Sequence, residues 1–214
     1  MEFPIPCRDS KWFFRHPSGV IYDWIIEPAL RPLKLQAMRL VRHYHLENIV
    51  DICCGSGNQC SYLAHFHVTG TDLNRNILRF AKRKYPQIPF FCADASRLPL
   101  KRHRLDGAIL SFALHDKKPL QRRKMIEQVS YCLAPDGKLI LIDFEPPWNS
   151  ESQKAARTVT WVERFAGASH YRNGRHFLAS GGLTEFIKNS GLIEIQRFDH
   201  VKTCSAVVLT QVRK

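Results

Sequence analysis

The apolar positions of this chain fall into short continuous runs that alternate with segments of helical periodicity. The runs at 49–52, 105–111 and 138–142 are mostly aliphatic, and the segment 74–84 places apolar residues three or four positions apart. Continuous aliphatic runs are typical of strands that are buried on both faces, as in a parallel sheet covered by helices. The pattern therefore predicts an α/β fold.

Two more strands are predicted near the carboxyl end of the chain. Residues 192–198 and 204–212 are rich in apolar side chains, and a short polar connection separates them. Such a pair is expected to form an antiparallel hairpin at the edge of the sheet. Strand periodicity is absent from residues 146–182.

The segment 20–46 has a helical pattern after Pro28 and Pro32. Because proline is favoured in the first turn of a helix, we expect the helix to begin at these prolines. The pattern predicts that Lys34, Arg39 and Arg42 point away from the apolar face. That apolar face is formed by Leu33, Ala37, Leu40, Val41 and Tyr44.

The most informative stretch follows the run at 49–52. The chain passes from Asp51 through Gly55 and Gly57 into a predicted helix, and a second strand ends at Asp72. Glycine lets the backbone approach a ligand without a Cβ in the way. An acid about 20 residues beyond such a loop is well placed to bind a ribose. These residues predict a site for a nucleoside cofactor.

Two common nucleotide sites fit this loop poorly. The dinucleotide fingerprint requires a third glycine three residues after the second, but Cys60 occupies that position after Gly57. A phosphate-binding Walker loop requires a Gly-Lys-Ser/Thr sequence, which does not follow the loop.

The loop and four later motifs resemble, in order, those of class I S-adenosylmethionine-dependent methyltransferases. The motifs are Asp51-x-x-x-Gly55-x-Gly57, the strand end at Asp72, Asp94-Ala95, the strand from Asp106 to His115, and Leu133-Ala-Pro-Asp-Gly137. The resemblance covers about residues 20–213. It implies an α/β Rossmann-like fold whose seven-stranded, mostly parallel sheet has an antiparallel edge strand and helices on both faces.

The resemblance also implies how the cofactor S-adenosylmethionine is held. The region of Asp51 and Gly55–Gly57 would hold its methionine end, Asp72 both ribose hydroxyls, and Asp94 with the Ala95 amide the adenine edge. A carboxylate suits the ribose because it can accept two hydrogen bonds at once; the alternative is that Asp72 only caps the following helix. The complete set implied for the cofactor is Tyr22, Asp51, Cys54, Gly55, Ser56, Gly57, Asp72, Leu73, Asp94, Ala95, Ser111 and Phe112.

Catalysis is predicted to involve His115. Its unperturbed pKa lies near neutrality, so it could accept a proton from a carbon acid, a hydroxyl or an ammonium nucleophile. The alternative is a histidine that only contacts the cofactor or a neighbouring loop. Asp116 is expected to be a helix N-cap for the residues from Lys117 onward.

Within the family, the chain is similar to the ubiquinone/menaquinone biosynthesis methyltransferases (methyltransferase type 11/25) and to small bacterial phospholipid N-methyltransferases. Tyr22-Asp23 and the glycine loop carry this likeness. Ala113-Leu-His-Asp116 stands where the quinone enzymes usually have Gly-x-Arg-Asn. The acceptor is therefore left open as a small or amphipathic molecule, quinone-like or lipid-like, methylated at carbon, oxygen or nitrogen.

We expect a single domain over residues 1–214. Its segments would be an N-terminal lid (1–46), a cofactor-binding core (47–145), an insertion that covers the substrate (146–182) and a closing helix with the strand hairpin (183–214). In the lid, Tyr22 and Trp24 would close over the methionine end. Substrate contacts are expected from Trp148, Trp161, His170, Tyr171 and His176.

Composition agrees with a globular protein, since 44% of the 214 residues are hydrophobic. The charged N-terminus lacks the apolar core of a signal peptide, and we expect a cytoplasmic protein. The seven cysteines lack paired spacing, which favours reduced thiols. Cys53, Cys54 and Cys60 are interpreted as packing residues, and no metal is expected.

The net charge of +13 raises the possibility of an anionic partner. Basic residues concentrate at 82–84, 97–104 and 117–124, where a solvated face is the commoner explanation. A peripheral contact with an anionic membrane surface is one expectation. The alternatives are an RNA-modifying methyltransferase that uses this charge, and a non-catalytic protein that binds the cofactor without transferring its methyl group.

Overall fold

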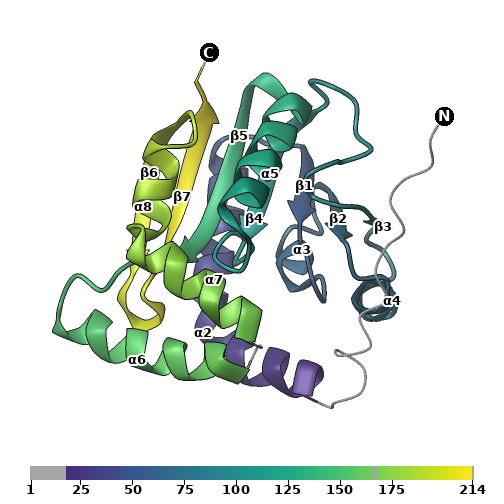
Figure 1. Cartoon of the computed structure of the whole chain (residues 1–214). Coiled ribbons are helices and arrows are strands. Elements are labelled where there is room, and N and C mark those ends of the chain that lie inside the picture. Colours follow the sequence, from purple (N-terminus) through teal and green to yellow (C-terminus); the bar gives the residue numbers. More distant parts are fainter. Residues whose placement is uncertain (1–17, 166–167, 214) are drawn as a thin grey trace.

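A seven-stranded sheet forms the centre of the molecule (Figure 1). The computed structural model describes residues 18–165 and 168–213, with side chains for 27–158, 164 and 168–213. The spatial order of the strands is β3-β2-β1-β4-β5-β7-β6. The strands are β1 (Asn48–Ile52), β2 (His67–Asp72), β3 (Phe90–Cys92), β4 (Leu105–Ser111), β5 (Leu133–Phe144), β6 (Leu192–His200) and β7 (Ser205–Val212).

Strands β1 to β5 are parallel, and β7 pairs antiparallel with both β5 and β6. The predicted mostly parallel sheet with an antiparallel edge is therefore confirmed. In the register, Ile52 lies opposite both Thr71 and Leu110. The residues that follow these three strands consequently meet at one edge of the sheet, its carboxyl edge.

Helices cover both faces, as expected. Apolar side chains of α2 (Ser18–His43) and α3 (Asn58–Tyr62) pack with alternate strand residues such as Ile49 and Ile109. On the other face, α5 (Pro119–Cys132) and α8 (Gly182–Lys188) pack with Val50 and Leu110. Adjacent strand residues point to opposite faces, which is why neighbours such as Ile49 and Val50 belong to different clusters. Helix α4 (Arg75–Lys84) follows β2.

The expected start of the N-terminal helix was wrong. Helix α2 begins at Ser18 and contains Pro28 and Pro32 in its interior. A proline removes one backbone hydrogen bond from a helix but does not always end it. Lys34 was expected on the solvent side and is instead only 6% exposed, in an ion pair with Glu27. Leu33, Ala37, Leu40 and Val41 are buried as predicted.

Most of the described residues between 146 and 182 are helical. Helices α6 (Ser150–Phe165) and α7 (Ala168–Ala179) lie across the end of the sheet where its carboxyl edge is found (Figure 1). We call these two helices the cover. None of the described helices is long and apolar enough to cross a membrane.

The cysteines depart from the expectation at one position. Cys53, Cys54, Cys60, Cys132 and Cys204 are free thiols. Cys92 is disulfide-bonded, so the expectation of reduced thiols was wrong there.

Candidate functional site

The glycine loop turns sharply between β1 and α3. Gly55 and Gly57 have φ values of +53° and +79°, which other residues rarely adopt. A Cβ on Gly57 would also lie 2.8 Å from the ring of Phe90. The loop is fastened to β2, because the Cys54 N–H donates to the Thr71 carbonyl at 2.9 Å. The local sequence thus needs glycine here for conformation and for space.

Asp72 joins the end of β2 to this loop. One carboxylate oxygen accepts the Gly55 N–H at 3.0 Å, and the other accepts the Asn74 N–H at 2.9 Å. Burial raises the pKa of Asp72 above its usual range. The N-cap of α4 is Asn74, whose side chain accepts the Asn76 and Ile77 N–H groups. Capping by Asp72 is therefore not needed, and its carboxylate keeps acceptor capacity for a ligand.

Asp51 lies near the carboxyl end of β1 and is buried, with 1% of its surface exposed. Its carboxylate accepts a hydrogen bond from the Cys60 thiol at 3.1 Å. Burial raises the pKa of Asp51 to about 7. Asp94 follows β3, and its carboxylate accepts both the backbone N–H of Ser96 and the Ser96 hydroxyl.

A cavity of about 630 Å³ lies between this edge and the cover. That volume is typical of a pocket for a small molecule. Its wall brings together most of the residues implied for the cofactor, whereas Gly57 does not line it and the Tyr22 side chain lies outside the described residues. The wall includes Asp51, Cys54, Gly55, Ser56, Asp72, Leu73, Asp94, Ala95, Ser111, Phe112, His115 and His170.

His115 is oriented by Asp143, a residue that the sequence interpretation did not assign to the site. The His115 ring Nδ1 lies 2.8 Å from Asp143 Oδ1, and both side chains are buried. The carboxylate of Asp143 also accepts the N–H groups of Leu114, His115 and Phe144. Asp143 directly follows the aliphatic run of β5, so its place at the carboxyl edge was the available signal. Ile142, the residue before Asp143, pairs with Ser111, the last residue of β4. Asp143 therefore lies just beyond the end of β4.

His170 reaches the same place from α7. Its Nε2 lies 3.2 Å from His115 Nε2, and its Nδ1 lies 3.7 Å from Asp116 Oδ2. The two imidazole rings meet edge to face, with centroids 5.1 Å apart. Despite these neighbours, the described residues include no group of three or more His, Cys, Asp or Glu side chains suited to a metal ion.

Asp116 does not cap a helix, so that expectation was wrong. Helix α5 begins at Pro119 with Lys118 as its N-cap. Asp116 instead accepts two hydrogen bonds from the Lys117 ammonium, at 2.6 and 2.7 Å. Proline is well suited to the first helical turn and moves the cap to the residue before it.

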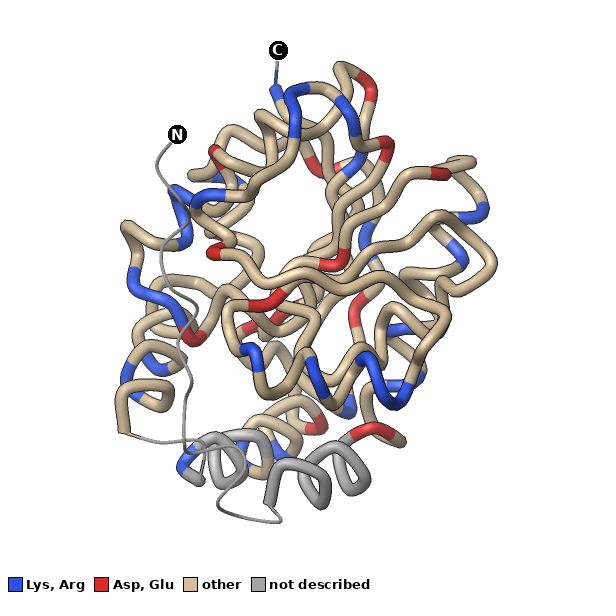
Figure 2. The backbone as a smooth tube through the Cα atoms, turned by 90° about the vertical axis from the view of Figure 1, so that its right-hand side faces the viewer, with Lys and Arg blue, Asp and Glu red and all other residues tan. Residues whose placement is uncertain are grey.

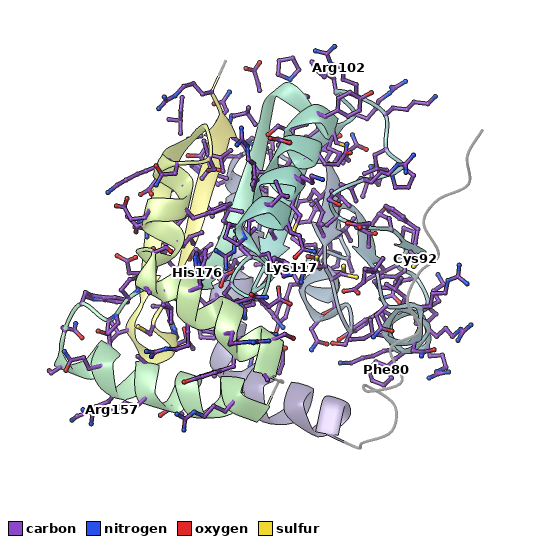
Figure 3. The ribbon with its side chains drawn as sticks, viewed as in Figure 1. Phe80, Cys92, Arg102, Lys117, Arg157 and His176 are labelled. Carbon is purple, nitrogen blue, oxygen red and sulfur yellow. The ribbon has the colours of Figure 1, made fainter. Side chains whose placement is uncertain are left out.

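Helix α7 is fastened to the segment 114–116 by two polar side chains. The Asn173 amide donates to the Asp116 carbonyl at 2.6 Å. The Arg122 guanidinium donates to the carbonyls of Leu114, His115 and Asn173. Arg122 is 4% exposed, so it does not belong to a solvated basic face as expected from the charge cluster at 117–124. Lys117, also of that cluster and labelled in Figure 3, lines the cavity and has a side chain that is 30% exposed.

The other residues expected to contact the substrate are placed differently. Trp148 is 44% exposed ahead of α6, Tyr171 lies under the Arg164 guanidinium, and His176 is exposed. These three do not line the cavity as the described residues form it. The Trp161 side chain, like those of Tyr22 and Trp24, lies outside the described residues. From the cover, the cavity is lined by Ala155, Thr158 and His170, and from the turn before β7 by Lys202 and Thr203.

Residues 49–137 match a protein family described as "Methyltransferase domain". Among similar curated proteins, an uncharacterised methyltransferase of Synechocystis is 33% identical over 48% of this chain and 50% of its own length. A 2-phytyl-1,4-naphtoquinone methyltransferase of Nostoc is 28% identical over 60% of each chain. A ubiquinone/menaquinone biosynthesis C-methyltransferase of Campylobacter jejuni is 30% identical over 45% of this chain and 44% of its own. The chain thus spans about half the length of these relatives.

Solved structures share the fold over most of the chain. The PH0226 protein of Pyrococcus horikoshii has a TM-score of 0.65 at 18% identity, covering 95% of this chain and 99% of its own. An S-adenosylmethionine-dependent methyltransferase of Methanosarcina mazei has a TM-score of 0.60 at 19% identity, covering 81% and 97%. At these identities the likeness concerns the fold alone.

Proposed function

We propose that this protein transfers a methyl group from S-adenosylmethionine to a small or amphipathic acceptor, and the match of residues 49–137 to a methyltransferase domain supports this. One observation carries the proposal. A single cavity is bounded by the glycine loop with Asp72 on one side and by the His115–Asp143 pair on the other. The proposed cofactor site and the proposed proton acceptor therefore share one cavity.

In this proposal, the strand ends hold the cofactor. Asp72 binds the ribose hydroxyls with the lone pairs that Gly55 and Asn74 leave available. Asp94 and the Ala95 amide meet the adenine, and the Gly55 loop with Asp51 meets the methionine end. A carboxylate at Asp51 would be stabilised by the positive charge of the methionine ammonium or the sulfonium.

Methyl transfer is an in-line displacement, so the protein's tasks are positioning, exclusion of water and removal of a proton. Asp143 holds His115 in one orientation and stabilises the positive charge that develops when the imidazole accepts a proton. The cover keeps water from the reacting atoms. His115 and Asp143 together accept the proton in this proposal, and both side chains are buried.

The acceptor that suits this cavity best is a quinol-like ring. Phe112 and Phe144 line the wall beside His115, with ring centroids 5.0 Å apart from each other. Aromatic and apolar walls suit a flat apolar ligand. The relatives named for naphthoquinone and menaquinone methylation support the same class.

Such acceptors reside in membranes, and we propose a cytoplasmic protein that contacts an anionic membrane surface peripherally. Lys and Arg recur along α4, including Arg79, Lys82 and Arg83 (Figure 2). On α6, Arg157 points away from the body of the molecule (Figure 3). Exposed cations of this kind are attracted to anionic lipid headgroups.

The direct test is methyl transfer to a reduced 2-alkyl-1,4-naphthoquinone with S-adenosylmethionine as donor, followed by mass spectrometry. We expect a singly methylated quinol and one equivalent of S-adenosylhomocysteine. Replacing His115 by Ala should lower the rate by about a hundredfold or more and leave cofactor affinity nearly unchanged. Absence of product from a panel of quinols and phenols, combined with salt-sensitive methylation of structured RNA, would overturn the small-acceptor proposal.

A further inference from the structure

We propose that Lys34 and Gln59 bind the amino-acid end of the cofactor, with Lys34 holding its α-carboxylate and Gln59 its α-ammonium group. This inference rests on the proposed use of S-adenosylmethionine as methyl donor. Lys34 belongs to α2 and Gln59 to α3, the helix that follows the glycine loop. Both residues line the cavity, as Asp51 does.

Gln59 presents a buried acceptor atom to this cavity. The residue is only 3% exposed, and its side-chain Oε1 has no hydrogen-bond partner among the described residues. A buried carbonyl oxygen without a donor is unfavourable, and native proteins keep few of them. Because Gln59 lines the cavity, a ligand bound there can supply the missing donor.

The orientation of the Gln59 amide follows from its other contact. Its Nε2 lies 3.5 Å from the backbone carbonyl oxygen of Lys34, which can only accept a hydrogen bond. The NH₂ group therefore lies on that side, and the atom without a partner is the oxygen. An amide oxygen can accept from an ammonium group but cannot donate to a carboxylate. Gln59 thus suits the positively charged half of a zwitterion.

Lys34 provides the complementary charge. Its side chain is 8% exposed, and its ammonium group forms an ion pair with Glu27. Glu27 is itself held by the Asn58 amide at 3.0 Å and by the Tyr62 hydroxyl at 3.3 Å. An ammonium group has three donors, so the ion pair with Glu27 leaves Lys34 able to bind a further anionic group. A carboxylate in the cavity is such a group.

The polar groups of β1, α2 and α3 lie close together. The Asp51 carboxylate accepts the thiol of Cys60, the residue that follows Gln59. Burial raises the pKa of Asp51, and the nearby positive charge of Lys34 acts in the opposite direction. An amino acid carries an ammonium and a carboxylate on the same carbon. Acceptors on Asp51 and Gln59 beside a cation on Lys34 match that pair of charges.

These contacts would distinguish the complete cofactor from smaller adenosine compounds. The ribose and adenine contacts proposed for Asp72 and Asp94 are available to any adenosine thioether. Lys34 and Gln59 would contact the amino acid alone. A ligand that lacks one of the two charged groups should therefore be insensitive to the residue that binds it.

Isothermal titration calorimetry tests this assignment without any methyl acceptor. The ligands are S-adenosylhomocysteine, 5′-S-(3-carboxypropyl)-5′-thioadenosine, which lacks the ammonium group, and 5′-S-(3-aminopropyl)-5′-thioadenosine, which lacks the carboxylate. Lys34→Met should weaken binding of the first two by about thirtyfold and leave the aminopropyl compound within about twofold. Gln59→Leu should weaken S-adenosylhomocysteine and the aminopropyl compound by about tenfold and leave the carboxypropyl compound within about twofold.

Controls separate this role from a structural one. Arg39→Met, at an exposed position of α2, should bind every ligand like the wild type. Gln59→Leu removes a buried oxygen without a partner and should fold about as stably as the wild type. All variants should bind 5′-methylthioadenosine, which lacks the whole amino acid, with equal affinity.

Two results would contradict the inference. Either both variants bind S-adenosylhomocysteine like the wild type, or they weaken all ligands equally, 5′-methylthioadenosine included. Both results leave the proposed methyl transfer intact, because the wild type still binds the cofactor product. Failure of the wild type to bind S-adenosylhomocysteine would overturn the proposed function together with the inference.

Discussion

The two sides of the cavity are built by different means. The strand-end wall, formed by residues 51–57, 72–74, 94–96 and 111–117, holds its polar groups through bonds within the sheet and its loops, as when Asp72 accepts the N–H of Gly55. Among the described residues, the cover meets this wall through side-chain contacts that include those of His170 and Asn173. The apolar contacts of the cover include those of Phe177, a residue of α7 that is buried in the core.

This difference suits the proposed methyl transfer, in which the cofactor is held in place and an acceptor enters and leaves. Groups that are fixed by backbone hydrogen bonds present the same geometry whether or not a ligand is bound. A cover held through side-chain contacts can move away to admit an acceptor and return to exclude water. Changes in the strand-end wall should therefore affect cofactor binding and stability, and changes in the cover should affect turnover.

The largest effect is expected where the two sides meet. In Asp143→Asn, the amide cannot accept all the hydrogen bonds that the carboxylate accepts now, and its NH₂ group would favour the other tautomer of His115. We expect the methyl transfer rate to fall by about a thousandfold, with cofactor affinity within about twofold of the wild-type value. Stopped-flow and calorimetric measurements check the two quantities. A fall of less than tenfold would show that Asp143 does not orient the base.

Within the strand-end wall, Asp51 should make stability depend on pH. Burial raises the pKa of Asp51 to about 7, whereas an unperturbed Asp carboxyl has a pKa of 3.8. The folded state thus retains a proton that the unfolded chain has released, and the resulting stabilisation is complete below pH 3.8 and is lost as the pH rises through 7. Urea unfolding without cofactor should show a decrease of about 3 kcal/mol between pH 5 and pH 8. In Asp51→Asn this decrease should largely disappear; an identical decrease would assign it to other groups.

The smallest effect is expected in the cover. Asn173→Ala removes one hydrogen bond to the Asp116 carbonyl, which should cost about 1 kcal/mol of stability. Turnover should fall by about tenfold because the cover is held less firmly over the cavity, and cofactor affinity should not change. Arg175→Ala, at an exposed position of the same helix, is the control. A loss of cofactor affinity in Asn173→Ala would remove the distinction between the two sides.

The parts of this structure that are local in sequence could be predicted from it. Aliphatic runs predicted the strands. Gly55, Gly57 and Asp72 predicted a loop that lies against a carboxylate at the end of a strand. Each of these features is encoded within one turn or one strand. The antiparallel pair at the edge was equally visible, since its two strands follow one another in the chain.

What could not be predicted depends on partners that are distant in sequence. Asp143 was missed because its role follows from β5 ending beside β4, and His115 and His170 become neighbours only when α7 folds over the sheet. Lys34 was expected in solvent because its partner Glu27 belongs to a helical stretch that the prolines concealed. Asp116 was expected to cap α5, but Pro119 sets where that helix begins.

The central claim is that the carboxyl edge of the sheet binds S-adenosylmethionine through Asp72, and isothermal titration calorimetry tests it most directly. We expect a micromolar dissociation constant for the wild-type protein, roughly −8 kcal/mol. Asp72→Ala should weaken binding by about 2 kcal/mol, or roughly thirtyfold, because a charged hydrogen bond is lost. Asp136→Ala, at an exposed position near the opposite edge, should bind like the wild type. No binding by the folded wild-type protein, or equal affinity in Asp72→Ala, would contradict the claim.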